Sequence, residues 1–225
     1  MSDLPYQDKP SPWSSHSRIA AVIEALPARS RVLDVGTASG MLARRSGNKF
    51  LRFFGIEAVK EWAEIAAPHY EKLWTCSFDD APEEALRGYD AVVLGDVLEH
   101  MSAPDTALKR LAGLQAPGCT FIISVPNVAN LWVRLNLLMG RFDYAERGIM
   151  DRTHLRFFTR KTLSAMVKET GLEILSIHVT PIPLELVSPF FSSGFGKVLH
   201  SAFAGLTSLL PTLLGYQFIL EAKKP

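Results

Sequence analysis

The sequence predicts an α/β fold built on a doubly wound sheet that is mostly parallel. Five apolar runs of strand length alternate with segments that favour helices, which is the pattern of parallel strands joined by crossover helices. These runs show little polar–apolar alternation, as is typical of parallel strands that are buried on both faces. The strand candidates are Arg31–Val35, Phe53–Ile56, Leu73–Ser77, Ala91–Leu94 and Thr120–Val125.

The composition supports a single domain over residues 1–225. The chain has 24 basic and 23 acidic residues, so its net charge of +1 argues against a protein that binds nucleic acid through bulk charge. A hydrophobic fraction of 48% in a chain of this length is enough for a sizeable core. Cys76 and Cys119 give no disulfide framework, and the polar N-terminus shows no signal peptide, so we expect a cytoplasmic protein.

The N-terminal third divides into an arm with a helix (residues 1–30) and the start of a cofactor-binding core (residues 31–126). Three prolines within residues 1–14 indicate an arm, and apolar residues at helical spacing predict a helix over Ser15–Leu26. Further helices are expected between the strands, around Met41–Asn48, Lys60–Pro68, Pro82–Leu86 and Pro104–Leu114.

After Pro126 the alternation ends, and residues 127–160 mix aromatics, arginines and glycines without a clean period. We interpret this segment as a lid over a substrate. Thr159 is the predicted N-cap of a helix that stops at Gly171. Two more strand candidates, Leu172–Val179 and Tyr216–Ala222, flank an apolar insert over residues 180–215.

The strongest functional signal is the turn that follows the first strand, from Asp34 to Gly40. Gly36 and Gly40 let the backbone turn sharply and approach a ligand, and in doubly wound sheets ligands bind at this edge. Glu57 lies 21 residues after Gly36, close to the spacing at which an acidic residue holds ribose hydroxyls. A carboxylate at Asp34 would repel a pyrophosphate but attract an ammonium and a sulfonium, which favours S-adenosylmethionine over a dinucleotide.

The pattern Asp34-x-Gly36-x-Ala38-x-Gly40 resembles the first motif, D-x-G-x-G-x-G, of class I S-adenosylmethionine-dependent methyltransferases, with Ala38 at a position where glycine is common. The resemblance covers roughly residues 32–171. It implies a Rossmann-like sheet of seven strands with an antiparallel last strand. It also implies that the turn holds the methionine moiety and Glu57 the ribose. The residues assigned to the cofactor are Asp34, Gly36, Thr37, Gly40, Glu57, Asp79 (near the adenine) and Asp96.

Asp96, Glu99 and His100 follow the fourth strand, and His154 comes later in the predicted lid. Methyl transfer to a hydroxyl needs positioning and a base, and a histidine that titrates near neutral pH suits that role. In one interpretation, His100 or His154 is the catalytic base, with Asp96 beside it. In another, the two histidines are structural: His100 caps a helix, and His154 forms a hydrogen bond across the lid.

A third interpretation is a divalent cation such as Mg²⁺ held by Asp96, Glu99, His100 and His154. The pattern acidic-x-x-Glu-His resembles that of the ubiquinone-biosynthesis O-methyltransferases, where such residues bind magnesium. Small-RNA 2′-O-methyltransferases are similar and add a later histidine. This chain has Asp96 where those families have glutamate, and it lacks the second adjacent histidine of the RNA group.

The resemblance implies methyl transfer to oxygen of a small-molecule or lipid-linked acceptor. Five arginines within residues 134–156 form either a solvated face or a site for an anionic acceptor such as a phosphosugar. Two alternatives stay open. One is a Rossmann-type NAD(P)-dependent oxidoreductase, and the other is a methyltransferase-fold subunit that binds without turnover.

The apolar insert contains a charge-free stretch, Ser201–Leu220. Pro211, two glycines and several hydroxyl residues make this stretch unlike a membrane span. We expect a helix around Gly196–Leu210 that breaks at Pro211 and is followed by the last strand. Its apolar face would dock on the sheet, cover the active site, pair with a second subunit in a homodimer, or rest on a membrane surface through residues 195–214.

Overall fold

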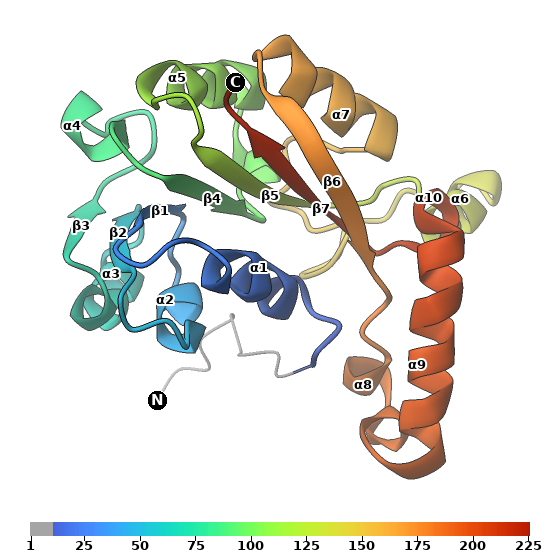
Figure 1. Cartoon of the computed structure of the whole chain (residues 1–225). Coiled ribbons are helices and arrows are strands. Elements are labelled where there is room, and N and C mark those ends of the chain that lie inside the picture. The colour runs from blue at the N-terminus through green and yellow to red at the C-terminus, as the bar shows by residue number, and fades with distance from the viewer. Residues whose placement is uncertain (1–10) are drawn as a thin grey trace.

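The computed structural model describes residues 11–225, which build one seven-stranded sheet with helices on both faces (Figure 1). The strand order is β3-β2-β1-β4-β5-β7-β6. The predicted Rossmann-like α/β fold is therefore confirmed. The strands are β1 (Arg31–Val35), β2 (Arg52–Glu57), β3 (Lys72–Thr75), β4 (Ala91–Gly95), β5 (Thr120–Pro126), β6 (Glu173–Thr180) and β7 (Gln217–Lys223).

The direction of the strands follows the prediction. β1 lies in the interior of the sheet and pairs in parallel with β2 on one side and β4 on the other. The order of the strands reverses between β1 and β4, which is the switch point where doubly wound sheets bind ligands. At the other end, β7 lies between β5 and β6 and runs antiparallel to both.

Two helical layers cover the sheet, one on each face (Figure 1). Neighbouring residues of β1 show the division: Val32 packs in the core under α1, and Leu33 packs in the core that includes α5 and α7. Apolar side chains on both faces explain why the strands lack alternation. The helices are α1 (Ser15–Glu24), α2 (Met41–Arg45), α3 (Lys60–Ala66), α4 (Glu83–Leu86), α5 (Pro104–Leu114), α6 (Leu131–Leu138) and α7 (Arg160–Glu169).

The insert between β6 and β7 is helical and projects from the edge of the molecule (Figure 1). It contains α8 (Leu184–Val187), α9 (Gly194–Leu209) and α10 (Pro211–Leu214). The predicted break at Pro211 is present, but the proline also opens α10, since its fixed φ and missing N–H suit a first helical position. Across residues 11–225, every helix is too short or too polar to cross a bilayer.

Two elements differ from the expectation. The third strand ends at Thr75, because Ser77 already belongs to a turn in which its hydroxyl accepts a hydrogen bond from the Asp80 backbone. The predicted lid contains α6, whose N-cap Asn130 accepts a hydrogen bond from the backbone of Trp132. Most of the predicted N-terminal arm, residues 1–10, lies outside the described residues.

Candidate active site

The turn after β1 is held in an unusual backbone conformation. Gly36 and Gly40 have φ of 75°, and Ala38 has φ of 46°, so all three lie in the left-handed region. The amides of Gly36 and Thr37 donate to the carbonyl of Ile56 at the end of β2. A side chain at Gly36 would collide with Val97, because its Cβ would lie 2.7 Å from Val97 Cγ2. The turn therefore packs tightly between the ends of β2 and β4.

Asp34 is a buried carboxylate beside this turn. Only 2% of the residue is exposed, and it accepts a hydrogen bond of 2.6 Å from the hydroxyl of Tyr70. Burial raises the pKa of Asp34 to about 6, the Tyr70 hydrogen bond opposes the shift, and the charge of Glu57 adds to it. A buried carboxylate without a cationic side chain to balance it suits a positively charged ligand.

Glu57, at the end of β2, stabilises the turn through hydrogen bonds to the backbone. Its Oε2 accepts a hydrogen bond of 2.7 Å from the Ala38 amide, and its Oε1 accepts one of 2.9 Å from the Val59 amide. Each carboxylate oxygen keeps a second lone pair that can accept a bond from a ligand hydroxyl. Glu57 is thus part of the architecture of the turn as well as a candidate ribose ligand.

A cavity of about 500 Å³ opens at this edge of the sheet, within the usual size for ligand sites. Among its described lining residues there is no lysine or arginine, whereas Asp34, Glu57 and Asp96 all line it. The predicted Gly36 and Thr37 line it too. We call it the cofactor cavity.

Two of the residues assigned to the cofactor lie outside the lining of this cavity. Gly40 opens α2, and a Cβ there would lie 3.1–3.3 Å from Ala66 and Tyr70. Its role is close packing of the turn. Asp79 is exposed in the loop before α4, so the structure does not bring it to the other predicted residues.

Asp96 lies at the carboxyl end of β4 with φ of 56°, a strained conformation for a residue with a side chain. Its Oδ1 accepts a hydrogen bond of 2.6 Å from Ser124 Oγ, and its Oδ2 accepts one of 2.7 Å from Gln217 Nε2. β5 and β7 thus fix the orientation of the Asp96 carboxylate.

Glu99, His100 and His154 form the candidate catalytic cluster. They offer ligand atoms that all lie within 4.8 Å of one another, and Asp96 is not part of this group. Glu99 is 1% exposed, and within residues 11–225 neither of its carboxylate oxygens has a hydrogen-bond partner. Burial, and next the charge of Asp96, raise the pKa of Glu99 well above its usual range.

Within the described residues, each histidine of the cluster has one ring nitrogen at hydrogen-bond distance from a carbonyl and one without such a contact. His100 Nδ1 lies 3.2 Å from the Thr153 carbonyl, and His154 Nδ1 lies 3.1 Å from the Ile149 carbonyl. Because a carbonyl only accepts, both Nδ1 atoms carry the proton, which leaves the Nε2 lone pairs free in the neutral rings. Burial lowers the pKa of His154, which favours the neutral ring. The hydrogen bond from His100 also joins the β4 end to the lid segment.

A second cavity of about 700 Å³ adjoins the first. Asp96, His100 and Asp151 line both cavities, so the candidate base lies at their junction. The predicted lid contributes Arg147 and His154 to the second cavity. The insert supplies much of the remaining wall. We call this the acceptor cavity.

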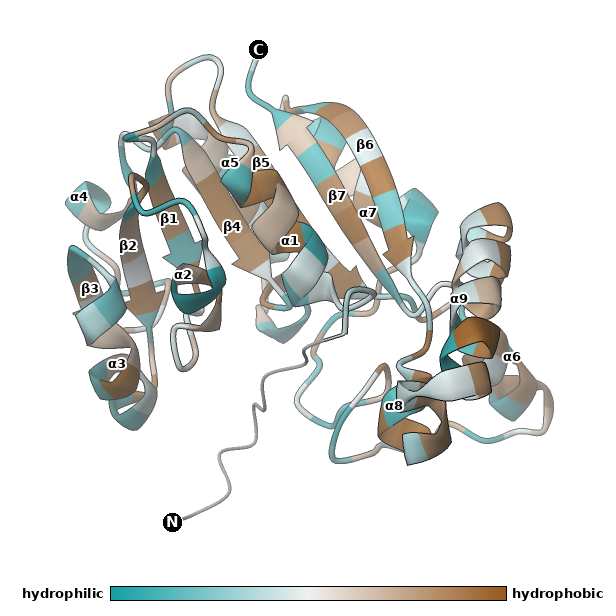
Figure 2. Ribbon diagram, turned by 60° about the horizontal axis from the view of Figure 1, so that its bottom comes forward, coloured by the Kyte–Doolittle hydropathy of each residue, from teal (hydrophilic) through white to brown (hydrophobic). Residues whose placement is uncertain are grey.

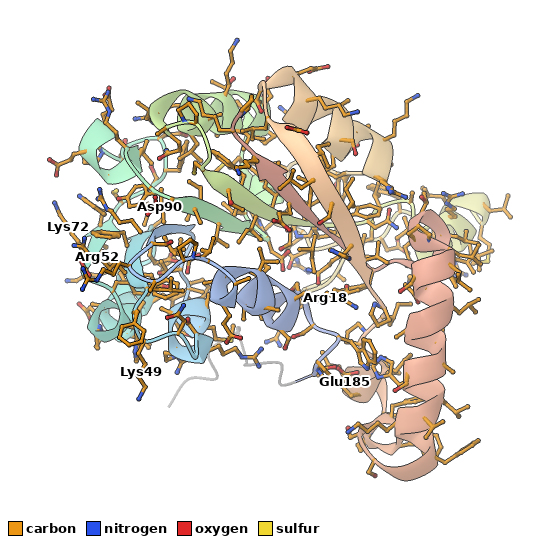
Figure 3. The ribbon with its side chains drawn as sticks, in the orientation of Figure 1. Arg18, Lys49, Arg52, Lys72, Asp90 and Glu185 are labelled. Carbon is orange, nitrogen blue, oxygen red and sulfur yellow. The ribbon has the colours of Figure 1, made fainter. Side chains whose placement is uncertain are left out.

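Glu185 and His200, two of the polar residues that the insert contributes to the acceptor cavity, lie beside each other. Glu185 on α8 (labelled in Figure 3) lies against His200 on α9, with 3.2 Å between Oε2 and Nδ1, and within the described chain this Oε2 accepts no hydrogen bond. His200 is 3% exposed, and its Nε2 has no hydrogen-bond partner within the described chain.

Comparison with known proteins identifies the family. The model of a family described as a methyltransferase domain matches residues 14–177, most of the chain. The chain belongs to the methyltransferase domain family. The predicted membership of the class I S-adenosylmethionine-dependent methyltransferases is confirmed, and the oxidoreductase alternative loses its support.

The curated relatives of this methyltransferase domain include ubiquinone biosynthesis O-methyltransferases. The mitochondrial enzyme of Homo sapiens is 26% identical over 158 residues, which are 65% of this chain and only 42% of the human protein. The enzyme of Aeromonas salmonicida (strain A449) is 25% identical over 166 residues, covering 68% of each chain. The chain therefore spans less than half the length of the first of these relatives.

Solved methyltransferase structures share the fold. An S-adenosylmethionine-dependent methyltransferase from Archaeoglobus fulgidus superposes with a TM-score of 0.65 at 17% identity, covering 93% of this chain and 92% of that one. Magnesium protoporphyrin IX methyltransferase from Synechocystis PCC 6803, solved with bound S-adenosylhomocysteine, gives a TM-score of 0.61 at 15% identity. That match covers 95% of this chain and 83% of the other.

Sequence reasoning missed several residues of the methyltransferase site. Tyr70, Ser124 and Gln217 donate hydrogen bonds to carboxylates of the site from distant positions in the sequence. None of the three belongs to a sequence motif that predicts such a role. Glu185 and His200 could have been noticed in the sequence, because they are the only acidic residue and the only histidine of the apolar insert over residues 180–215.

Proposed function

We propose that the protein transfers the methyl group of S-adenosylmethionine to a hydroxyl oxygen of a small or lipid-linked acceptor. The observation that carries this proposal is the junction of the two cavities at Asp96, His100 and Asp151. One cavity contains the family's nucleoside motif, and the other is lined by histidines with available nitrogens. The name of the relatives, O-methyltransferases, supports oxygen as the acceptor atom.

The lining of the cofactor cavity fits a cationic nucleoside. Asp34, Glu57 and Asp96 supply negative charge, and no lysine or arginine of the described lining offsets it. When bound, S-adenosylmethionine supplies a methyl group on a positively charged sulfur. Asp34 would hold the cationic amino group, and Glu57 would accept hydrogen bonds from the ribose hydroxyls.

The base in this proposal is the Nε2 atom of His154 or His100. Its lone pair accepts the proton of the acceptor hydroxyl while that oxygen is methylated. The Ile149 and Thr153 carbonyls hold the two Nδ1 protons, so the tautomer with a free Nε2 is present before the acceptor binds. The carboxyl group of buried Glu99 lies in the same cluster as both rings.

A metal ion is the second candidate for activating the hydroxyl. The two oxygens of Glu99, which have no hydrogen-bond partner within residues 11–225, and the two Nε2 atoms have the chemistry of metal ligands. Two imidazoles and one carboxylate suit Fe²⁺ or Zn²⁺ better than Mg²⁺, which prefers oxygen ligands. Asp96, the fourth residue of the predicted metal set, is already held by Ser124 and Gln217. Turnover that survives exhaustive chelation would exclude the metal.

Two measurements test the proposed function. Calorimetry with S-adenosylhomocysteine and with NAD should show binding of the first only, and the reverse would overturn the cofactor assignment. A screen of phenols, quinols and nucleotide sugars with methyl-labelled cofactor should then find a labelled ether product. Tight binding of the thioether nucleoside without turnover of any acceptor class would favour the alternative of a binding subunit.

A further inference from the structure

Helix α9 buries its small and polar residues and exposes its large apolar ones, which is the reverse of an ordinary amphipathic surface helix. Its inward face carries small and polar residues, which are Gly196, His200, Ala204 and Thr207. Its outward face carries large apolar residues at helical spacing, which are Phe195, Val198, Leu206 and Leu209. A surface helix of a soluble protein normally turns its apolar stripe toward the core. Here Leu209 is 77% exposed, so the stripe is available to a partner.

Helix α6 extends this apolar surface. The side-chain amide of Asn130, its N-cap, donates to the carbonyls of Leu214, the last residue of α10, and of Gly215, which connects the start of α6 to the end of the insert. α6 and the C-terminal part of α9 lie side by side, with hydrophobic residues on both (Figures 1 and 2). The exposed large apolar residues of α6, of Met139 just after it, and of residues 186–210 include Trp132, Leu135, Leu138, Met139, Leu186, Val187, Phe190, Phe195, Val198, Leu206, Leu209 and Leu210.

The charge on this surface has one sign. Residues 127–142 and 186–216 contain no aspartate or glutamate. Arg134, Arg141 and Lys197 are all exposed within them. Basic side chains that border exposed aromatic and leucine residues are the pattern of segments that lie in the interface of an anionic bilayer.

We infer that the surface formed by α6 and by residues 186–210, the α6–α9 surface, docks on an anionic lipid bilayer. α9 lies along the membrane rather than crossing it, since it is too short to span one. Its outward apolar stripe enters the acyl boundary, and the three cations contact lipid phosphates. A second copy of the chain fits less well. A two-fold contact would press the same three cations onto a surface that has no carboxylate to receive them.

The docking surface runs into the acceptor cavity. Leu186, Val187 and Lys197 belong to the surface and also line that cavity. A lipid-linked acceptor held in the bilayer would therefore find the mouth of the cavity at the membrane. This last step depends on the proposed function, whereas the docking itself does not.

The test is flotation of the full chain with vesicles of phosphatidylcholine alone and of phosphatidylcholine mixed with phosphatidylglycerol. We expect binding to the mixed vesicles that weakens with added salt. The variant Phe195→Ser/Leu206→Ser/Leu209→Ser should lose at least tenfold in partitioning, because each change removes an exposed side chain from the acyl boundary. The variant Arg134→Gln/Arg141→Gln/Lys197→Gln should lose on the order of tenfold to a hundredfold on mixed vesicles only.

The matched control is a variant in which three exposed apolar residues outside the α6–α9 surface are replaced by serine. Phe50, Ile65 and Leu175 are exposed apolar residues away from α6 and α9, and their triple replacement by serine should leave vesicle binding unchanged. Circular dichroism melting checks that every variant folds. Failure of the parent protein to float, or flotation of the α9 variant equal to that of the parent, overturns the inference. So does a stable dimer that the α9 variant dissociates.

These outcomes are independent of the proposed function. Binding of S-adenosylhomocysteine reports on the cofactor cavity and should be the same in all three variants. A protein that binds vesicles but not the thioether nucleoside would keep the docking inference and lose the methyltransferase proposal.

Discussion

At the scale of single residues, Asp34 is a site where function opposes stability. Its pKa rises from 3.8 to about 6, mainly through burial, so the folded protein binds a proton there more readily than the unfolded chain. The contribution of this group to stability is present at acidic pH and is lost as pH rises through about 6. The cost at neutral pH follows from about 1.4 kcal/mol for each pKa unit and amounts to about 2–3 kcal/mol.

The variant Asp34→Asn should therefore be more stable than the parent at neutral pH and bind S-adenosylmethionine more weakly. Asparagine can still accept the Tyr70 hydrogen bond, but it carries no charge to desolvate. Urea unfolding at neutral pH should show a gain of up to about 2–3 kcal/mol, which disappears near pH 4. If parent and variant have equal free energies of unfolding at both pH values, the pKa of Asp34 is not raised in the folded protein.

Ala38 is a second strained residue, with φ of 46° in the turn after β1. Ala38→Gly should raise the free energy of unfolding by about 0.5–1 kcal/mol, because glycine adopts this conformation without a steric penalty. The matched control is Ala43→Gly in α2, which should lower it by about 1 kcal/mol. Thermal melts of both variants measure the difference, and a loss of stability in Ala38→Gly would contradict the strain.

The residues of the turn that line the cofactor cavity could be predicted, because a glycine or an acidic residue at this spacing after a strand is a local sequence pattern. The sequence could not show Tyr70, which reaches Asp34 across 36 positions of sequence. That contact exists only because β2 and the helix after it fold against β1. Such partners depend on packing, so a single sequence does not reveal them.

At the scale of elements, the pairing of α8 with α9 through Glu185 and His200 can be separated from ordinary packing. We predict that Glu185→Leu alone costs about 2–3 kcal/mol, since it removes the carboxylate that lies 3.2 Å from Nδ1 of buried His200 and puts an apolar group in its place. The double variant Glu185→Leu/His200→Phe should cost less than about 1 kcal/mol, because both polar groups are gone.

A double-mutant cycle in chemical denaturant gives the coupling between the two side chains. If the double variant loses as much as the sum of the single changes, the pair has no mutual role. If the double variant raises the KM for an acceptor but leaves the affinity for S-adenosylhomocysteine unchanged, Glu185 and His200 take part in acceptor binding.

The strands were predictable because burial on both faces of a parallel sheet leaves long apolar runs. α6 was not, since its residues are apolar nearly all round and only Val133 is buried, so no amphipathic period exists. α9 was predicted in place and length. Which face of α9 is exposed could not be predicted, because the periodicity shows that one face is apolar but not whether that face is buried or exposed.

At the scale of the whole molecule, the proposed reaction should depend on pH through the charge of the cofactor cavity. We predict that kcat/KM falls as pH is lowered through about 6, where Asp34 becomes protonated and loses its attraction for the cationic donor. His154 contributes less to this limb because burial lowers its pKa below 6.5. A pH profile of the parent, beside one for Asp34→Asn, measures the effect. A flat profile through this range would contradict it.

His154→Gln should separate chemistry from binding. Loss of the base should lower kcat by about 100-fold or more, whereas the affinity for S-adenosylhomocysteine should stay within about twofold. Matched His100→Gln data identify which of the two rings takes the proton. An active His154→Gln enzyme would assign the residue to structure, as the hydrogen bond to Ile149 would allow.

The position of β7 has a consequence for biosynthesis. Synthesised after every other strand of the sheet, it fills the slot between β5 and β6 and carries the Gln217 amide that holds Asp96. On the ribosome, the nascent chain must keep that slot open, with the edges of two strands exposed, until β7 emerges. A chaperone that shields strand edges should therefore matter most in the interval between the synthesis of β6 and the emergence of β7.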